Sequence, residues 1–129
     1  MRSTGFSTFN RASSEPERGN ATVGFVASVG LLLMVVYTVI AASLGWYVHA
    51  IATDSAMEGA RAGAIGGSPA LAAERTKDLM TSTLAESYAS NITAHATETG
   101  IEVIVRAPIP GAGFLGDDVI EVRAHANRE

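Results

Sequence analysis

One stretch of this chain constrains its whole architecture: Phe25–Ile40, which reads FVASVGLLLMVVYTVI. It lies within about 35 residues, Gly19–Thr53, that contain no Asp, Glu, Lys or Arg, whereas about 20 apolar residues are enough to cross a bilayer. A single segment in lipid satisfies its backbone amides and carbonyls only as a helix. The sequence therefore predicts one N-terminal membrane helix, whose transmembrane part covers about residues 22–47.

The predicted helix does not end at the membrane boundary. Ala50–Ile65 is rich in alanine and compatible with a helix, and Gly66-Gly67 is a helix C-terminal stop signal. We expect one helix over residues 20–66, about 70 Å long at 1.5 Å per residue, with roughly half of it beyond the bilayer. Trp46 and Tyr47 follow the apolar core where aromatic side chains gather at a membrane interface. They are either interface anchors or ordinary helix residues.

Small residues recur along this helix at intervals of four, a spacing that lets helix backbones approach closely in lipid. Glycine inside a helix costs about 1 kcal/mol relative to alanine, so a pair of glycines at this spacing is the strongest candidate for a packing face. Chance spacing in an alanine-rich chain is the alternative. The predicted helix-packing pairs are Gly24 and Ser28, Ala41 and Gly45, and Gly59 and Gly63.

Basic residues indicate the orientation of the helix. Arg11 and Arg18 precede it, whereas the first base beyond it is Arg61, which predicts a cytoplasmic N-terminus and a C-terminus outside. The apolar core is about twice as long as that of a cleaved secretory signal, which favours a membrane anchor over such a signal. Residues 1–19 are expected to form a short polar leader, disordered up to Arg18.

Residues 67–129 are expected to form a small extracytoplasmic α+β module. Ser68 and Pro69 are a typical N-cap and first helical residue, and an amphipathic pattern continues to about Ser90. The apolar period then changes to two in three short segments, which predicts an antiparallel meander packed by one face on this second helix. The segments cover residues 92–96, 101–106 and 120–126. Such a module leaves little interior for a substrate pocket.

The composition excludes several classes of function. The chain has 129 residues, a net charge of −4 and no cysteine, so it has neither disulfides nor thiolate metal ligands. It has no basic run, so no nucleic-acid partner is expected. His95 and His125 would be neighbours if the first and third strands paired, but no further metal ligand accompanies them. The loop Gly111–Gly116 does not lead from a strand into a helix, as a phosphate-binding loop does. We therefore predict no enzyme, no cofactor and no metal site.

The two ends of the long helix carry short motifs: RGNATVGF over residues 18–25, and, after Tyr47-Val48, EGARA over residues 58–62. Together they resemble the TadE-like family, the minor pilin or pseudopilin proteins of tight-adherence (Flp-type) pilus systems. The resemblance covers about a third of the chain and needs no gap. The residues that carry it are Arg18, Thr22, Val23, Phe25, Glu58 and Arg61.

The resemblance implies a type IV pilin-like architecture and a structural role in a pilus. A prepilin peptidase would cut after Gly19 and leave Asn20 as the mature N-terminus. The implied partners are other major and minor pilins, the inner-membrane assembly platform and the lipid bilayer. The implied location is the bacterial cytoplasmic membrane, and the extracellular pilus after assembly. The chain's nine basic residues include a single lysine, Lys77, which with the alanine content indicates a GC-rich bacterial genome.

Two positions depart from the family pattern: Gly24 replaces the family's glutamate and Gly30 replaces a proline. In related pilins that glutamate neutralises the N-terminus of a neighbouring subunit, so its loss fits a subunit at the fibre tip or one that primes assembly. Glu58 and Arg61 are spaced to form an ion pair within the helix or to contact an adjacent subunit. The alternative function is an unprocessed single-pass membrane anchor or receptor whose outer module binds an envelope component.

Overall fold

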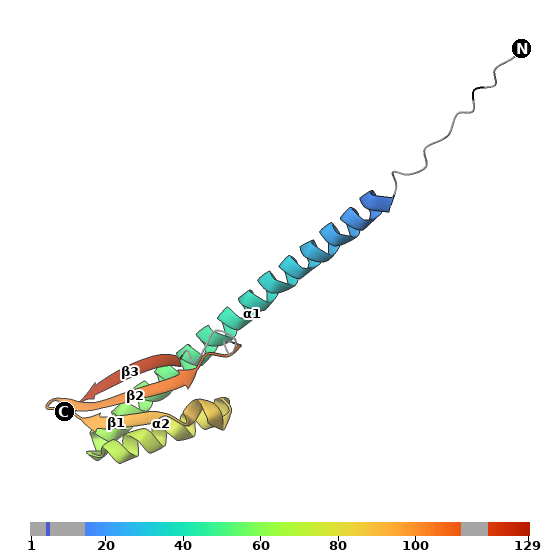
Figure 1. Ribbon diagram of the computed structural model, residues 1–129. Coiled ribbons are helices and arrows are strands. Elements are labelled where there is room, and N and C mark those ends of the chain that lie inside the picture. The colour runs from blue at the N-terminus through green and yellow to red at the C-terminus, as the bar shows by residue number, and fades with distance from the viewer. Residues whose placement is uncertain (1–4, 6–14, 112–118) are drawn as a thin grey trace, which may run out of the picture. The chain divides into compact units, whose positions relative to one another are not determined.

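The computed structural model describes Gly5, residues 15–111 and residues 119–129, with side chains from Glu17 onward in the long helix. Contacts divide the chain into two compact units, Met1–Thr38 and Val39–Glu129. The predicted α+β layout of a long helix, a second helix and a three-stranded antiparallel sheet is confirmed (Figure 1). The elements are α1 (Glu15–Gly66), α2 (Pro69–Thr83), the 3-10 helix η1 (Glu86–Ala89), β1 (Ile92–Ala96), β2 (Gly100–Pro108) and β3 (Val119–Asn127).

In the first unit, the described chain is almost entirely the N-terminal part of α1. The helix begins at Glu15, so the expectation of disorder up to Arg18 is wrong for the last four of those residues. Glu17 suits this first part of the helix, because an acidic side chain is favourable near a helix N-terminus. The rest of the predicted leader, residues 1–4 and 6–14, lies outside the described residues.

In the second unit, α1 continues past Tyr47 and ends at Gly66, as the double glycine predicted. Gly67 has φ +68°, a left-handed conformation that glycine adopts without a Cβ clash. The Ser68 amide then donates to the Gly63 carbonyl at 3.1 Å, which is the hydrogen bond of a Schellman C-cap. This turn reverses the chain directly into α2.

The start of α2 agrees with the sequence and its end does not. The Ser68 hydroxyl caps the helix by accepting from the Leu71 amide at 3.4 Å, and Pro69 follows in the first turn. The helix stops at Thr83 rather than near Ser90, because Leu84 is extended. Hydroxyl-rich segments compete with helical hydrogen bonding, and Ser82 donates to the Leu79 carbonyl at 2.7 Å just before the stop.

The amphipathic pattern beyond Thr83 nevertheless marks the core. Leu84 and Tyr88 both pack against the buried cluster, Tyr88 from within η1. The pattern therefore identified the residues that face inward but not the helix type that presents them.

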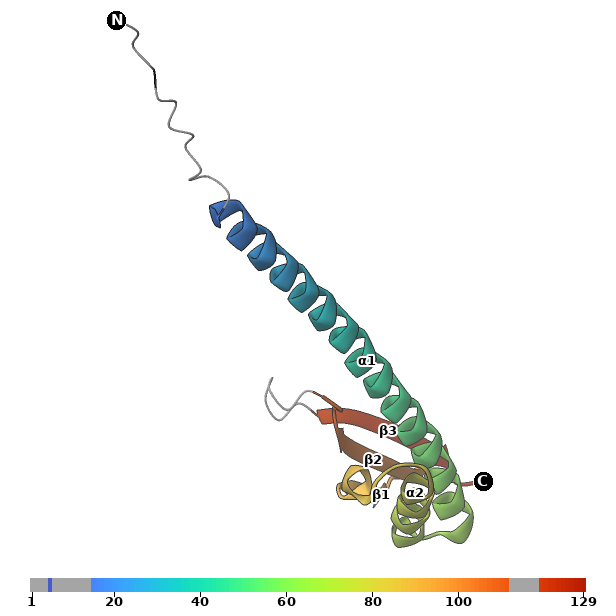
Figure 2. The ribbon, with the colours of Figure 1, turned by 90° about the vertical axis from the view of Figure 1, so that its right-hand side faces the viewer.

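The sheet has the order β1-β2-β3, with both pairs antiparallel. Its inner face carries Ile101, Val103 and Val105, all fully buried. The helices α1 and α2 lie side by side next to this sheet (Figure 2). From the helices the buried cluster takes Ala52, Ala56 and Ala60 of α1 and Ala72 and Met80 of α2. Both helices therefore cover one face of the sheet, and the other face carries its polar side chains.

Candidate functional site

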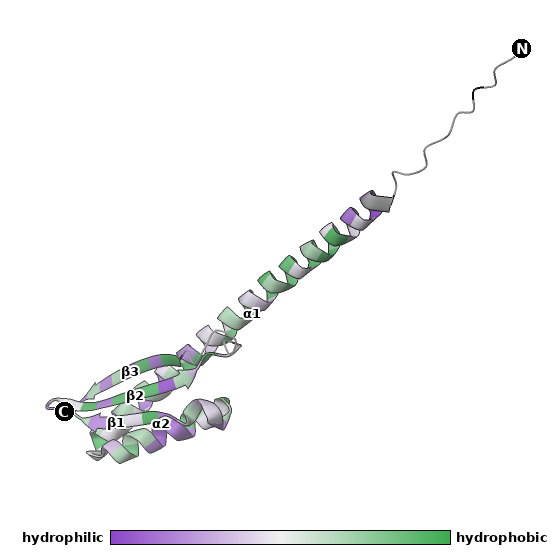
Figure 3. Ribbon diagram, in the orientation of Figure 1, coloured by the Kyte–Doolittle hydropathy of each residue, from purple (hydrophilic) through white to green (hydrophobic). Residues whose placement is uncertain are grey.

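The most extensive candidate surface is the apolar part of α1. Apolar residues make up most of this part of the helix (Figure 3). Its large side chains are exposed all around the helix, for example Phe25 at 70%, Leu32 at 62% and Met34 at 67%. A helix that is apolar on every side is stable inside a membrane or among other helices. Within the described residues, α1 is the one helix long and apolar enough to cross a membrane, and none of its most apolar stretch is buried. A single-pass membrane anchor is compatible with this helix.

Serine and threonine hydroxyls within the apolar part of α1 are all hydrogen-bonded inside the helix. Each donates to the carbonyl four residues earlier: Thr22 to Arg18 at 3.0 Å, and Ser28, Thr38 and Ser43 to their acceptors at 2.8 Å. An unpaired hydroxyl in hydrocarbon is costly, because lipid offers no partner. These bonds remove that cost, so the four polar side chains do not oppose a lipid environment.

The N-terminal motif lies along the exposed first turns of α1. Arg18, Gly19, Asn20, Thr22 and Val23 are exposed, and Phe25 continues the exposed surface. Gly19 and Gly24 have open space where a side chain would stand. The candidate cleavage site between Gly19 and Asn20 is therefore accessible and helical.

The predicted packing glycines near the end of α1 contact α2 of the same chain. A Cβ added at Gly59 would collide with the Thr76 hydroxyl and lie 2.7 Å from the Ala72 carbonyl oxygen. A Cβ at Gly63 would lie 2.5 Å from the Ala72 Cβ. Gly59 and Gly63 thus allow two helices to approach within one module, and they are buried rather than available to another subunit.

The other predicted small-residue pairs differ in their surroundings. Ala41 and Gly45 are partly buried, and Gly45 faces Ile109. Gly24 and Ser28 are exposed on the apolar segment, and open space surrounds Gly24. Of the three pairs, only Gly24 and Ser28 present a fully open small-residue face.

Glu58 and Arg61 of the C-terminal motif are both exposed, and no ion pair joins them in the described part of the chain. Arg61 instead lines a groove of about 1010 Å³ between the end of α1 and the end of β3. The groove also includes Met57, Ile65 and Arg128. The motif arginine thus lines a surface hollow whose walls include apolar, basic and acidic residues.

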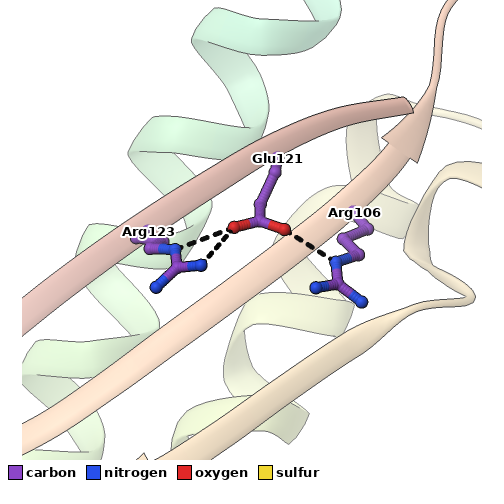
Figure 4. Close-up of polar contacts among 3 residues, drawn as sticks. All are labelled: Arg106, Glu121 and Arg123. Atoms are coloured by element: carbon purple, nitrogen blue, oxygen red, sulfur yellow. Dashed lines mark hydrogen bonds and ion pairs between the residues drawn. The ribbon is translucent and has the colours of Figure 1, made fainter. Parts of the chain in front are cut away.

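The outer face of the sheet carries a charged cluster that sequence analysis did not identify. The Glu121 carboxylate accepts from Arg106 Nε at 2.8 Å and from Arg123 Nε at 2.8 Å (Figure 4). Two hydrogen bonds lower the pKa of Glu121 below its ordinary value. The bond from Arg106 has the largest effect, and the bond from Arg123 has the next largest. The bonds to Glu121 also raise the pKa of Arg123. Arg106 and Glu121 are register partners in β2 and β3, so the pairing depends on how the hairpin closes.

The two strand histidines are not neighbours, because β2 lies between β1 and β3. His95 and His125 each lie opposite Glu102, on different sides of it. His125 Nε2 is 2.9 Å from Asn127 Oδ1 and 3.2 Å from Thr99 Oγ1. No group of three or more potential metal ligands occurs among residues 15–111 and 119–129. The Gly111–Gly116 loop lies, beyond Gly111, outside the described residues.

Comparisons with family models, with curated proteins and with solved structures found no match for this chain. The geometry of the described residues is therefore the basis for the functional argument.

Proposed function

We propose that this chain is a structural minor pilin (pseudopilin) of a Tad/Flp-type pilus, anchored by α1 and acting at the fibre tip or in priming assembly. The observation that carries the proposal is the uninterrupted helix Glu15–Gly66. Its N-terminal part exposes apolar side chains on every side, and its C-terminal part belongs to the core of a small α+β module.

The length of α1 argues against a simple tether. About 20 residues are enough to cross a bilayer, whereas α1 has 52. The extra turns are not a solvated stalk, because Ala52, Ala56 and Ala60 are fully buried against α2 and the sheet. One helix therefore serves both as the candidate membrane segment and as a structural element of the outer module, an arrangement that suits a subunit held by helix packing.

The apolar part of α1 suits two environments in turn. In a membrane its exposed valine, leucine and isoleucine side chains contact lipid, and in a fibre the same side chains contact neighbouring helices. Gly24 and Ser28 provide an open small-residue face on this segment. At such a face another helix backbone approaches closely, which gains van der Waals contact in the absence of a hydrophobic driving force.

Gly24 supports a tip or priming role over a place in the fibre shaft. A charge inside the bilayer is expensive unless it is paired, so a glutamate at this position makes docking depend on a positive partner. With Gly24 the chain inserts without that requirement and also lacks the pairing that orders shaft subunits. The whole segment Gly19–Thr53 is free of Asp, Glu, Lys and Arg, so no nearby carboxylate takes over that role.

Processing after Gly19 requires local unwinding of α1, since the helix begins at Glu15. Only one turn precedes the bond, and glycine lowers the cost of unwinding by about 1 kcal/mol relative to alanine. Helix ends also open more readily than helix interiors. The proposed cut is therefore placed where the helix is least stable.

The proposal is tested by intact-mass measurement and N-terminal sequencing of the protein isolated from membranes and from sheared pili. We expect a mature chain that starts at Asn20 and is present in pili or bound to the assembly platform. Gly19→Val should retain residues 1–19, and Gly5→Val, at another glycine with open surroundings, should be processed normally. A chain that keeps Met1–Gly19 and occurs only in membranes would support the single-pass anchor instead.

A further inference from the structure

The end of the sheet where β2 stops and β3 starts lies beside one particular turn of α1. Ile109, which directly follows β2, has a side-chain methyl 3.9 Å from the position of a Cβ at Gly45. Pro108 and Val119 are register partners, so Val119 belongs to the same end of the sheet. Two parts of the chain that are far apart in sequence therefore meet at the level of Gly45.

Gly45 also lies beside the aromatic residues that follow the apolar core of α1. Leu44, Trp46 and Tyr47 are 48%, 77% and 51% exposed. The first charged residue of α1 after Arg18 is Asp54. Asp54 lies about 13 Å beyond Gly45 along the helix. If the charge-free segment crosses a bilayer, its amphipathic aromatic side chains belong at the headgroup level. The adjoining end of the sheet then lies at that level too.

The chemistry of this sheet end fits an interfacial position. Val119 is 54% exposed on the outer face of the sheet, and Ile109 and Pro110 are partly exposed. The first charged side chains on the strands are Arg106 and Glu121, which form an ion pair in which Glu121 also contacts Arg123. The two aspartates that precede Val119 in the sequence lie outside the described residues.

We infer that the outer module rests on the lipid surface through a membrane rim, defined as Leu44, Trp46, Tyr47, Ile109 and Val119. The occupant of this surface is the headgroup region of a bilayer, because the rim is continuous along α1 with the apolar segment. Transfer of apolar and aromatic side chains from water to this region lowers the free energy. The inference rests on the membrane anchoring in the proposed function and adds a second point of contact, on the sheet.

A second point of contact restrains the module as well as anchoring it. A helix alone leaves its soluble module free to rotate about the helix axis, whereas contact through Val119 and Ile109 selects one rotation. Asp54, Glu58 and Arg61 lie further along α1 than the rim, so they remain in water and available to protein partners. The restraint thus presents a fixed polar surface to the next subunit.

Tryptophan fluorescence of the full chain in phosphatidylcholine vesicles tests the inference. Trp46 is the only tryptophan, so it reports the membrane level of α1 without labelling. In a Trp46→Phe background, Ile109→Trp and Val119→Trp place the probe on the sheet side of the rim. Ile65→Trp is the matched control, because Ile65 is also apolar and exposed but lies about 30 Å further along α1.

We expect phosphatidylcholine brominated near its ester groups to quench Trp46 and both sheet-side probes severalfold more than the Ile65→Trp probe. Aqueous acrylamide should show the reverse order. Val119 is exposed, so Val119→Trp leaves the core intact even if Ile109→Trp disturbs the contact with Gly45. Quenching of Trp46 without quenching of the Val119→Trp probe would overturn the inference. That result would still agree with membrane anchoring through α1. Loss of lipid quenching at Trp46 itself would contradict the anchor and therefore the proposed function.

Discussion

Replacing Gly59 with alanine tests whether α1 and α2 are packed as closely as the structure indicates. The added Cβ would collide with the Thr76 hydroxyl and approach the Ala72 carbonyl oxygen to 2.7 Å. The carbonyl belongs to the backbone of α2, so relief requires the helices to separate. Overpacking of this kind costs about 1–3 kcal/mol, while alanine in place of a helical glycine gains about 1 kcal/mol. We expect a net destabilisation of up to about 2 kcal/mol.

Gly45→Ala is the matched control, because it changes the same residue type within the same helix. Its Cβ would lie 3.9 Å from Ile109, an ordinary contact, so only the gain in helix propensity remains. The propensity contributions cancel when the two variants are compared, and the difference isolates the overpacking cost at about 1–3 kcal/mol. The assay is urea unfolding of the full chain in a mild detergent, measured by hydrogen exchange of the amides of β2, the central strand of the module.

A second variant separates the two obstacles at Gly59. Thr76→Ala removes the hydroxyl that the added Cβ meets first but leaves the Ala72 carbonyl in place. We expect the double variant to recover part of the loss, with a coupling of about 0.5 kcal/mol or more. If Gly59→Ala unfolds at the same urea concentration as Gly45→Ala, or at a higher one, the close approach of α1 and α2 is refuted.

Three further predictions concern the outer module. Gly67→Ala should destabilise the module by about 1–2 kcal/mol in the same exchange assay, because the Cβ of alanine makes a φ of +68° unfavourable. An unchanged urea midpoint would contradict this prediction. Met80→Ala, at a fully buried side chain, should cost about 2–5 kcal/mol, visible as a lower Tm. The lowered pKa of Glu121 means that its contribution to stability is present above the ordinary pKa of 4.5 and is lost as the pH falls through the folded-state pKa. Arg106→Gln or Arg123→Gln should raise the pKa of Glu121 in a carboxyl-carbon NMR titration, and an unchanged titration would exclude the cluster.

The features predicted correctly from sequence are those that one local pattern determines. A charge-free apolar run predicts a helix without knowledge of its neighbours, and Gly66-Gly67 ends that helix by backbone geometry alone. The strands followed from a period of two, since alternate residues along each strand differ in burial. The end of α2 was missed, because Leu84 and Tyr88 continue a helical spacing while η1 presents Tyr88 to the core.

The surfaces were harder to predict, because they depend on which elements meet. The small-residue spacing singled out Gly59 and Gly63 as sites of close approach, but spacing does not specify the partner helix, and the structure places α2 there. The Arg106–Glu121 pair depends on register between two strands. Its only signal in the sequence is that the two residues are equally distant from the middle of the Gly111–Gly116 loop.

The change in composition along α1 explains how one helix can serve two environments. Its N-terminal part uses valine, leucine and isoleucine, whose large apolar surfaces make transfer into lipid favourable. From Val48 onward, the buried positions at intervals of four are Ala52, Ala56, Ala60 and Ala64. Alanine contributes little transfer free energy, but it lets α2 and the sheet approach the helix closely. Because the same helix supplies the apolar segment and these core positions, the module cannot separate from α1 without exposing Ile101, Val103 and Val105. Attachment and folding of the module therefore depend on one continuous element, as the proposed structural role requires.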